Sequence, residues 1–266
     1  MNDTISGGSP ARRAGWLKAL GWLALIAGLA VGAIALAAPV GVWLGLWEFG
    51  TGFQLLFNVA NVWGVRVALA AAIVGVALIV LARVLGTGNG LKLGALAFAG
   101  ALIAWVGYAV PESYRPAEDV PAIHDISTDT EDPPRFVAVL PLRADAANTT
   151  EYGGSPNMTP ERVAELTRQA YPDLTTAMLP LPPEEAFERA LAAVETLGWD
   201  LVAAAPEEGR VEATDTTFWF RFKDDIVIRI RAADGGSEVD ARSVSRVGLG
   251  DAGTNAARLR RFFEVL

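Results

Sequence analysis

The chain has 266 residues, 52% of them hydrophobic, and a formal net charge of −8 at pH 7. This length allows one large domain or two small ones, and the hydrophobic share exceeds that of ordinary soluble proteins. Cysteine is absent, which excludes disulfides, thiol catalysis, cysteine-ligated metals and an anchor on a lipidated cysteine.

The charged side chains are unevenly distributed along the chain. The first 110 residues hold six basic and two acidic side chains, whereas the remainder holds 16 basic and 28 acidic ones. An apolar, slightly basic half is therefore fused to an acidic, water-soluble half. An acidic domain repels the phosphate backbone of DNA and RNA, so we expect no nucleic-acid partner.

A polar tail and three apolar runs make up the first half. Residues 1–15 are expected to form a disordered cytoplasmic tail. Residues 16–110 are expected to form a membrane anchor of three transmembrane helices, at about 20–42, 65–85 and 91–110. Aromatic side chains between the first two runs predict a connection at the lipid headgroup level.

The first apolar run has an alternative interpretation as a cleaved secretory signal, because Ala35, Leu36 and Ala37 have the spacing of a cleavage site. Its apolar core of roughly 20 residues is, however, longer than the ~7–15 residues of a signal sequence. We therefore favour a retained helix. Since we find no ionisable residue deep in the three runs, we interpret them as an anchor rather than a transport path.

Basic residues near the ends of the runs predict the orientation. Arg12, Arg13 and Lys18 precede the first run, and Arg83 and Lys92 bracket the turn between the second and third. The positive-inside rule places these residues in the cytoplasm. We therefore expect a protein of the bacterial inner membrane, partnered by the lipid bilayer, with everything after the third run in the periplasm.

Residues 111–266 predict a soluble α+β domain. A threonine cap and an N1 proline predict a first helix at about 159–170. The last part predicts the order helix, four strands, helix, with the two helices packed on one face of an antiparallel sheet. The expected ranges are 182–197 for the helix, 199–204, 210–222, 226–231 and 238–246 for the strands, 223–225 for a turn, and 252–265 for the last helix.

The stretch between the last strand and the last helix is dense in polar side chains interleaved with glycine. Alternation along the strand places Ser243 and Ser245 on one face, and Arg242 and Arg246 on the other. Asp251 suits the N-cap of the last helix.

Two interpretations of this stretch are open. In the structural one, Arg246, Asp251 and Arg258 pair with Asp224 and Asp225 and hold one corner of the domain together. In the functional one, the arginines and the helix N-terminus bind a carboxylate, phosphate or sulfate group. The candidate ligand-binding residues are His124, Asp125, Asp129, Asp224, Asp225, Arg242, Ser243, Ser245, Arg246, Asp251, Asn255 and Arg258.

The single histidine, His124, raises two catalytic possibilities, a metal site with nearby aspartates and a Ser-His-Asp hydrolase. No HxxxH or EF-hand spacing supports the metal, and no Gly-x-Ser-x-Gly motif supports the hydrolase. We therefore predict no catalytic residue, no metal site and no cofactor.

Several short motifs of the second half resemble one known family. They are Ile123–Asp129, Asp132–Pro134, Tyr171–Pro172, Phe222–Asp225, Arg242–Gly248, Asp251–Asn255 and Arg258. Their order and spacing resemble those of the bacterial family DUF1499, over about residues 111–266. The resemblance implies an envelope domain without an assigned activity or established catalytic residues.

Three hypotheses about function follow. The favoured one is a non-enzymatic inner-membrane protein whose periplasmic domain binds another envelope protein or helps to organise the envelope. The second is a domain that binds a small anionic ligand through Arg242, Arg246 and the amides near Gly253. The third is an envelope hydrolase or metalloenzyme that uses His124.

Overall fold

The computed structural model describes residues 10–115, 120–154 and 158–266. The chain divides into two compact units, Met1–Arg115 and Pro116–Leu266. Of the tail predicted for residues 1–15, the first nine lie outside the described residues, and the rest belong to the first helix.

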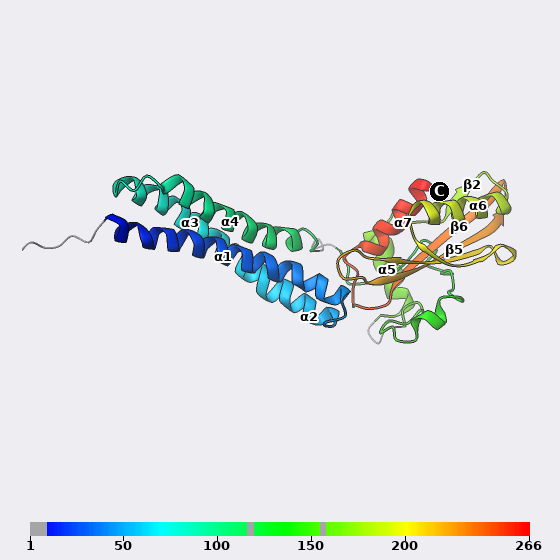
Figure 1. The fold of residues 1–266 in the computed structure, drawn as a ribbon. Coiled ribbons are helices and arrows are strands. Elements are labelled where there is room, and N and C mark those ends of the chain that lie inside the picture. The colour runs from blue at the N-terminus through cyan, green and yellow to red at the C-terminus, as the bar shows by residue number, and fades with distance from the viewer. Residues whose placement is uncertain (1–9, 116–119, 155–157) are drawn as a thin grey trace, which may run out of the picture. The chain divides into compact units, whose positions relative to one another are not determined.

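The first unit is helical (Figure 1). Its elements are α1 (Pro10–Trp43), α2 (Phe49–Phe53), the π-helical segment η1 (Gln54–Asn61), α3 (Val62–Val84) and α4 (Gly90–Glu112). Three stretches are long and apolar enough to cross a membrane, Gly15–Trp43, Phe49–Val84 and Gly90–Glu112. The aromatic connection expected before the second span is itself helical from Phe49 onward. Glycine disfavours helix, so Gly50 and Gly52 had indicated a break at this point.

Small residues allow the backbones of this bundle to touch. A Cβ atom added to Gly28 of α1 would lie 2.1 Å from the carbonyl oxygen of Gly100 of α4. One added to Gly64 of α3 would lie 2.9 Å from the carbonyl oxygen of Ala104. Close backbone contact is how helices associate in lipid, where burying apolar surface provides no net gain. Large side chains such as Leu23 and Ile73 are exposed on the outer surface, as a lipid environment requires.

The second unit is an α+β domain built on one antiparallel sheet, as predicted. Its elements are β1 (Asp125–Ser127), η2 (Leu140–Arg143), α5 (Pro160–Ala170), β2 (Ala177–Leu179), α6 (Pro183–Thr196), β3 (Asp200–Ala205), η3 (Pro206–Glu208), β4 (Arg210–Thr216), β5 (Lys223–Ala233), β6 (Gly236–Ser245) and α7 (Thr254–Val265). The strand order is β1-β6-β5-β4-β3. The short β2 shares the outer edge of β6 with β1, β1 pairing with its C-terminal half and β2 with its N-terminal half.

The connection between β4 and β5 differs from the prediction. The strand expected over 210–222 ends at Thr216, and the turn expected at 223–225 is the first part of β5. The chain reverses instead over residues 217–222, where Arg221 has a φ of 56°. Asp224 and Asp225 belong to a residue type that is common in turns. In the folded domain Asp224 forms an ion pair with Arg258 and Asp225 forms one with Arg246, and these pairs favour the strand.

The start of the last helix also differs from the prediction. It begins at Thr254, its N-cap position is Gly253, and Ala252 has a left-handed φ of 55°. Asp251 is therefore not the N-cap itself. Its carboxylate nevertheless accepts hydrogen bonds from the backbone N–H groups of Gly253 and Asn255, at 2.8 and 2.7 Å.

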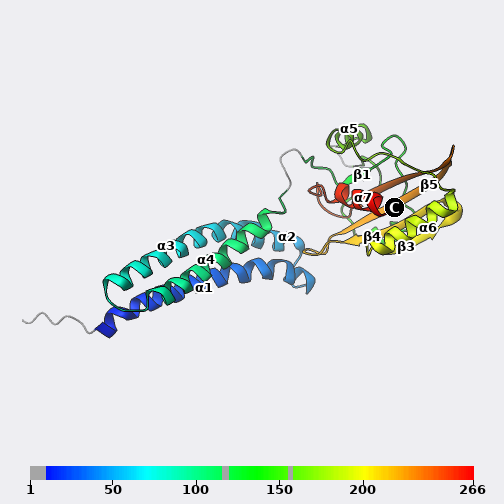
Figure 2. The same ribbon diagram turned by 90° about the horizontal axis from the view of Figure 1, so that it is seen from above.

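One face of the sheet, here called the helix face, is covered by α6 and α7 (Figures 1 and 2). Ala186, Phe187, Ala190 and Val194 of α6, with Leu259 and Phe262 of α7, pack against Ile226, Ile228 and Ile230 of β5. Burying each large apolar side chain contributes about 1.5–3 kcal/mol. The alternating isoleucines of β5 and the 3.6-residue spacing of α6 therefore account for this layer.

The opposite face, here called the loop face, is covered by the irregular covering segment, residues 128–152. Its apolar core is small and consists of Phe136, Val139, Val227 and Val244. Most of the remaining side chains between the sheet and the covering segment are charged or polar, so the loop face holds many of the candidate site residues.

Candidate functional site

The structure distributes the predicted site residues over both faces of the sheet. Asp224 and Asp225 are neighbours in β5, so their side chains point to opposite faces. The helix-face cluster consists of Asp215, Asp224, Ser243, Ser245, Asn255 and Arg258. The loop-face network includes Asp125, Arg143, Glu212, Asp225, Arg242 and Arg246. The single corner expected from the sequence is therefore two separate sites.

Arg258 of α7 is the centre of the helix-face cluster and is completely buried. Its Nη2 donates to Oδ2 of Asp224 at 2.7 Å, and its Nε donates to Oδ2 of Asp215 at 2.8 Å. Its Nη1 donates to Oδ1 of Asn255 at 2.5 Å. Two carboxylates neutralise one guanidinium, so the cluster has no surplus positive charge for an anion.

Asn255 joins the helix-face cluster to the first strand. Its Nδ2 donates to the carbonyl oxygen of His124 at 3.0 Å and to Oγ of Ser245 at 2.9 Å, and its Oδ1 accepts from Oγ of Ser243 at 2.7 Å. The hydroxyl groups of Ser243 and Ser245 are therefore both hydrogen-bonded to Asn255. Nearby, burial raises the pKa of Asp251, and the adjacent Asp224 carboxylate adds to this, although the two backbone amides lower it.

The histidine contributes to this corner mainly through its backbone. Its carbonyl oxygen accepts from the N–H of Ser245 at 3.0 Å, in addition to the Asn255 amide. Its ring Nδ1 lies 3.3 Å from the carbonyl oxygen of Leu249. These contacts hold His124 against the loop after β6. None of them joins it to a serine hydroxyl or to a carboxylate.

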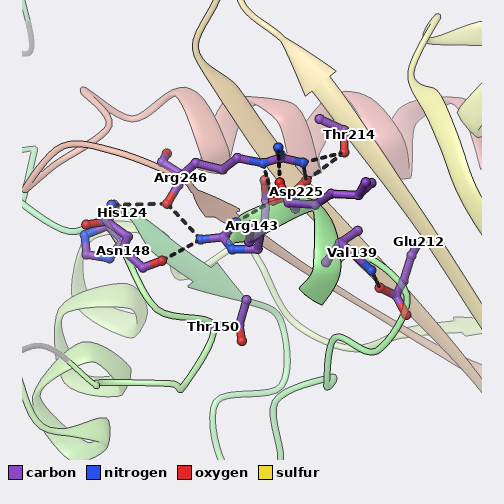
Figure 3. Close-up of polar contacts among 12 residues, drawn as sticks. His124, Val139, Arg143, Asn148, Thr150, Glu212, Thr214, Asp225 and Arg246 are labelled. Atoms are coloured by element: carbon purple, nitrogen blue, oxygen red, sulfur yellow. Dashed lines mark hydrogen bonds and ion pairs between the residues drawn. The ribbon is translucent and has the colours of Figure 1, made fainter. Parts of the chain in front are cut away.

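Asp225 is the centre of the loop-face network (Figure 3). Arg246 binds it with two hydrogen bonds, Nε to Oδ2 at 2.9 Å and Nη2 to Oδ1 at 2.8 Å. Arg143 of the covering segment donates to Oδ2 at 2.5 Å, and Thr214 donates to Oδ1 at 2.6 Å. Burial alone would raise the pKa of Asp225, but the hydrogen bonds from Arg246, Thr214 and Arg143 lower it below its ordinary value.

Arg242 forms a second clamp on the same face. Its Nε and Nη2 bind both carboxylate oxygens of Asp125, at 2.8 and 2.7 Å. The guanidinium lies 5.2 Å from the ring centroids of both Phe136 and Tyr152. It also donates to the carbonyl oxygens of Pro134 at 3.1 Å and Thr150 at 2.7 Å. One buried arginine therefore fastens the covering segment to the sheet at two points, Pro134 and Thr150.

Glu212 of β4 is a member of the loop-face network that the sequence did not indicate. Its buried carboxylate accepts from three successive backbone N–H groups, those of Val137, Ala138 and Val139, at 3.0, 3.0 and 2.9 Å. It also pairs with Arg210. In the sequence it alternates with Val211 and Ala213, a pattern that predicts a solvent-exposed position, so no local signal marks it.

The last predicted residue, Asp129, belongs to a separate group of charges farther along the loop face. Its Oδ2 accepts from Nη2 of Arg229 at 2.9 Å, and Arg229 also binds the buried Asp240. Burial would raise the pKa of Asp129, but the backbone amides of Asp132 and Glu131, with Arg229, lower it. This group extends the pattern in which sheet arginines bind the covering segment.

The arrangement on the loop face is suited to holding a chain segment in place. Its guanidinium groups bind carboxylates and backbone carbonyl oxygens, and its glutamate binds backbone amides. Within residues 10–115, 120–154 and 158–266, no group of three or more His, Cys, Asp or Glu side chains could hold a metal ion.

Comparison with known proteins identifies one relation. Residues 125–266 match a family model described as a protein of unknown function, DUF1499. No curated protein matches the chain, and no solved structure matches it. The matched range begins at β1 and includes both clusters described above.

Proposed function

The chain belongs to the DUF1499 family, and from that premise we propose that it is a non-enzymatic, membrane-anchored protein of the bacterial envelope. Its second unit is then a periplasmic domain that binds another envelope protein or helps to organise the envelope. The three membrane-capable helices support the anchor. The basic residues Arg83 and Lys92, which flank the turn between α3 and α4, support a cytoplasmic location for that turn.

The observation that carries the non-enzymatic proposal is the use of the conspicuous charges by the fold itself. Arg242 is occupied by Asp125 and by two carbonyl oxygens, and Arg246 is occupied by Asp225 and by the carbonyl oxygen of Leu142. An anion at either guanidinium would have to displace a buried carboxylate, and removing one partner of such a pair costs about 3–5 kcal/mol. Recognition of a partner is therefore left to the surface of the domain.

A small anionic ligand is the second candidate, and one observation favours it. Two guanidiniums, those of Arg143 and Arg246, share the single carboxylate of Asp225, so this point carries excess positive charge. Native mass spectrometry of the full-length protein, extracted gently from membranes, separates the candidates. Added protein subunits support the proposal, whereas a reproducible added mass of small-molecule size supports the ligand-binding alternative.

The orientation can be tested with single cysteines, because the chain has none of its own. We suggest Thr87→Cys in the turn after α3 and Asp234→Cys in the turn between β5 and β6. In intact cells whose outer membrane has been permeabilised, a membrane-impermeant maleimide is expected to label position 234 and not position 87. The reverse pattern would overturn the periplasmic location while leaving the anchor intact.

The role of the candidate site can be tested by complementation in a deletion strain. We expect His124→Ala to complement fully, and Arg246→Ala to lose complementation in proportion to its loss of folded protein, measured by protease resistance. The exposed Arg261→Ala is the matched control. An Arg246→Ala protein that is folded at wild-type level yet inactive would show that the site functions directly and would refute the structural role.

A further inference from the structure

Three basic side chains gather at one end of the first unit, here called the basic end. They are Lys18 of α1, Arg83 of α3 and Lys92 of α4. All three are exposed, and each has a buried neighbour in the chain. The neighbours are Leu17, Ala82 and Leu93, which belong to one apolar cluster in the core of the bundle. The basic side chains therefore surround the end of that core.

The helix contacts place the three basic residues at a similar level of the bundle. A Cβ atom added to Gly90 of α4 would lie 2.9 Å from the Cβ atom of Ala82 in α3. One added to Gly21 of α1 would lie 3.3 Å from the carbonyl oxygen of Leu93 in α4. The start of α1 and the turn between α3 and α4 accordingly lie side by side in both views (Figures 1 and 2).

No carboxylate neutralises the basic end within the described part of the first unit, residues 10–115. The acidic side chains of that range are Glu48, between α1 and α2, and Glu112, in the last turn of α4. Both lie at the opposite end of the bundle, because α1 and α4 run away from the basic end. The ion pair of this range joins Glu112 to Arg115, at 2.8 Å, and includes none of the three residues of the basic end.

The basic residues of the opposite end, in contrast, have partners inside the unit. The guanidinium of Arg115 binds Glu112 and lies 5.5 Å from the ring centroid of Phe57. That of Arg66 lies 5.5 Å from the ring centroid of Trp63. Within the described bundle, the basic end therefore carries the positive charge that the unit itself leaves available.

The basic end lies at the depth of lipid headgroups when the bundle spans a membrane. The stretch from Lys92 to Glu112 is about 30 Å long at the rise of an α-helix, which matches the hydrocarbon core of a bilayer. Trp16 and Trp22, within about one turn of Lys18 on α1, are 46% and 53% exposed. Indole rings favour the headgroup level, so they indicate the same depth for Lys18.

The surface beside these charges is apolar, and this combination selects the occupant. Leu20, Val84 and Leu91 are exposed, and each lies within two residues of a basic side chain. An anionic phospholipid offers both matching parts, a negatively charged headgroup and acyl chains directly below it. A dissolved phosphate ion would match the charges alone. Each basic side chain near an anionic lipid surface strengthens the contact roughly fivefold.

We infer that the basic end is a binding surface for anionic phospholipid. Lys18, Arg83 and Lys92 hold headgroup phosphates, and the adjoining apolar side chains contact the acyl chains. The inference rests on the membrane anchor proposed above and is independent of the side of the membrane on which the basic end lies. Lipid bound to residues of different helices also ties the ends of α1, α3 and α4 together.

The test uses the full-length protein reconstituted in phosphatidylcholine membranes that contain a trace of spin-labelled lipid. The label is on the acyl chain of either phosphatidylglycerol, which is anionic, or phosphatidylcholine, which has no net charge. Electron paramagnetic resonance distinguishes the labelled lipid that the protein immobilises from the free lipid. We expect severalfold stronger association of the anionic lipid, and a loss of this preference in about 1 M sodium chloride, which screens the charges.

Variants that remove charge locate the preference. The triple variant Lys18→Gln, Arg83→Gln and Lys92→Gln is expected to lower the preference for the anionic lipid to about half or less. The matched control changes three other exposed basic residues and is expected to retain the preference. It combines Arg66→Gln, Arg189→Gln and Lys223→Gln. An equal loss in the control would overturn the assignment to the basic end.

The outcomes separate this inference from the anchor on which it rests. Absence of immobilised lipid with either label would refute the anchor itself. Equal association of the two labelled lipids, or a preference that persists in about 1 M salt, would overturn the inference alone. An unchanged preference in the triple variant would do the same. The salt dependence is measured on the wild-type protein, so a triple variant that fails to insert leaves the test intact.

Inorganic phosphate distinguishes the lipid from the free ion. At equal ionic strength, potassium phosphate and potassium chloride are expected to weaken the preference equally, since both act by screening. A much stronger effect of phosphate would show that the basic end binds the free ion, and would overturn the assignment to lipid.

Discussion

The two faces of the sheet are covered in different ways, and the contrast explains where the charges lie. On the helix face, α6 and α7 satisfy their own backbone hydrogen bonds and need to offer the sheet little beyond apolar side chains. On the loop face, the covering segment is mostly irregular, and its internal backbone hydrogen bonds are confined to the turns around η2, from Leu142 to Val139 and from Ala146 to Arg143. A buried polar backbone group without a partner is costly, so side chains from the sheet must supply the partners.

The loop-face network meets this need with charged groups. Glu212 takes three backbone N–H groups, and Arg242 and Arg246 between them take three backbone carbonyl oxygens. Buried ion pairs contribute little net stability compared with apolar packing, but breaking one is expensive. The loop face therefore depends on a complete set of partners, whereas the helix face depends on summed apolar area.

The largest expected effect comes from breaking the centre of the loop-face network. Asp225→Asn leaves the buried guanidinium of Arg143 and the partly buried one of Arg246 without their carboxylate, and we expect a loss of about 3–5 kcal/mol. Hydrogen exchange of the full-length protein should show the covering segment deprotected. Asp173→Asn is the control, because its pair with Arg260 is exposed and worth at most about 1 kcal/mol. Equal effects of the two changes would refute the central role of Asp225.

A smaller effect is expected at the carboxylate that binds backbone amides. Glu212→Gln keeps the size of the side chain but removes the charge and one of the two acceptor oxygens, at a cost of about 2 kcal/mol. Deprotection should be greatest at the amides of Val137, Ala138 and Val139. Exchange at these three amides that matches wild type would contradict the role of Glu212, and Glu208→Gln on the exposed surface provides the baseline.

The helix face should respond more weakly and more evenly. Ile228→Val removes one buried methyl group, and we expect a loss of about 0.5–1.5 kcal/mol. Because this layer is one continuous apolar core, the loss should lower protection across β5, α6 and α7 together. Deprotection confined to the covering segment would show that the two faces are not independent layers.

The smallest effect expected near neutral pH is that of pH on the stability of the loop face. The pKa of Asp225 is lowered in the folded protein, so its contribution to stability is present above the unfolded-state value of 3.8 and is lost as pH falls below it through the folded value. Exchange protection of the covering segment, corrected for intrinsic rates, should be flat from about pH 5 to 8 and fall below about pH 4. Asp225→Asn should remove this acid-dependent part. Persistence of the same acid transition in that variant would assign it to other carboxylates.

Part of this fold could be predicted because its signals are local. The apolar runs of the anchor, the threonine that accepts from the N–H of Arg162 at the start of α5, and the alternating isoleucines of β5 each act within a few neighbouring residues. The structural interpretation expected Arg246, Asp251 and Arg258 to pair with Asp224 and Asp225. Arg246 pairs with Asp225 and Arg258 with Asp224, whereas Asp251 accepts from backbone amides. Their placement on opposite faces was not predicted, because Asp224 and Asp225 resembled a turn.

The sequence by itself thus determined the two-part organisation, the helical periods and the strand alternation, since these depend on the spacing of neighbouring side chains. Only the tertiary structure decided which face the covering segment occupies and which charges it uses. Asp125 and Arg242 are 117 residues apart, and Glu212 lies more than 70 residues from the amides that it binds. Such partners are selected by the closing of the sheet and the burial of their charges, which no local pattern encodes.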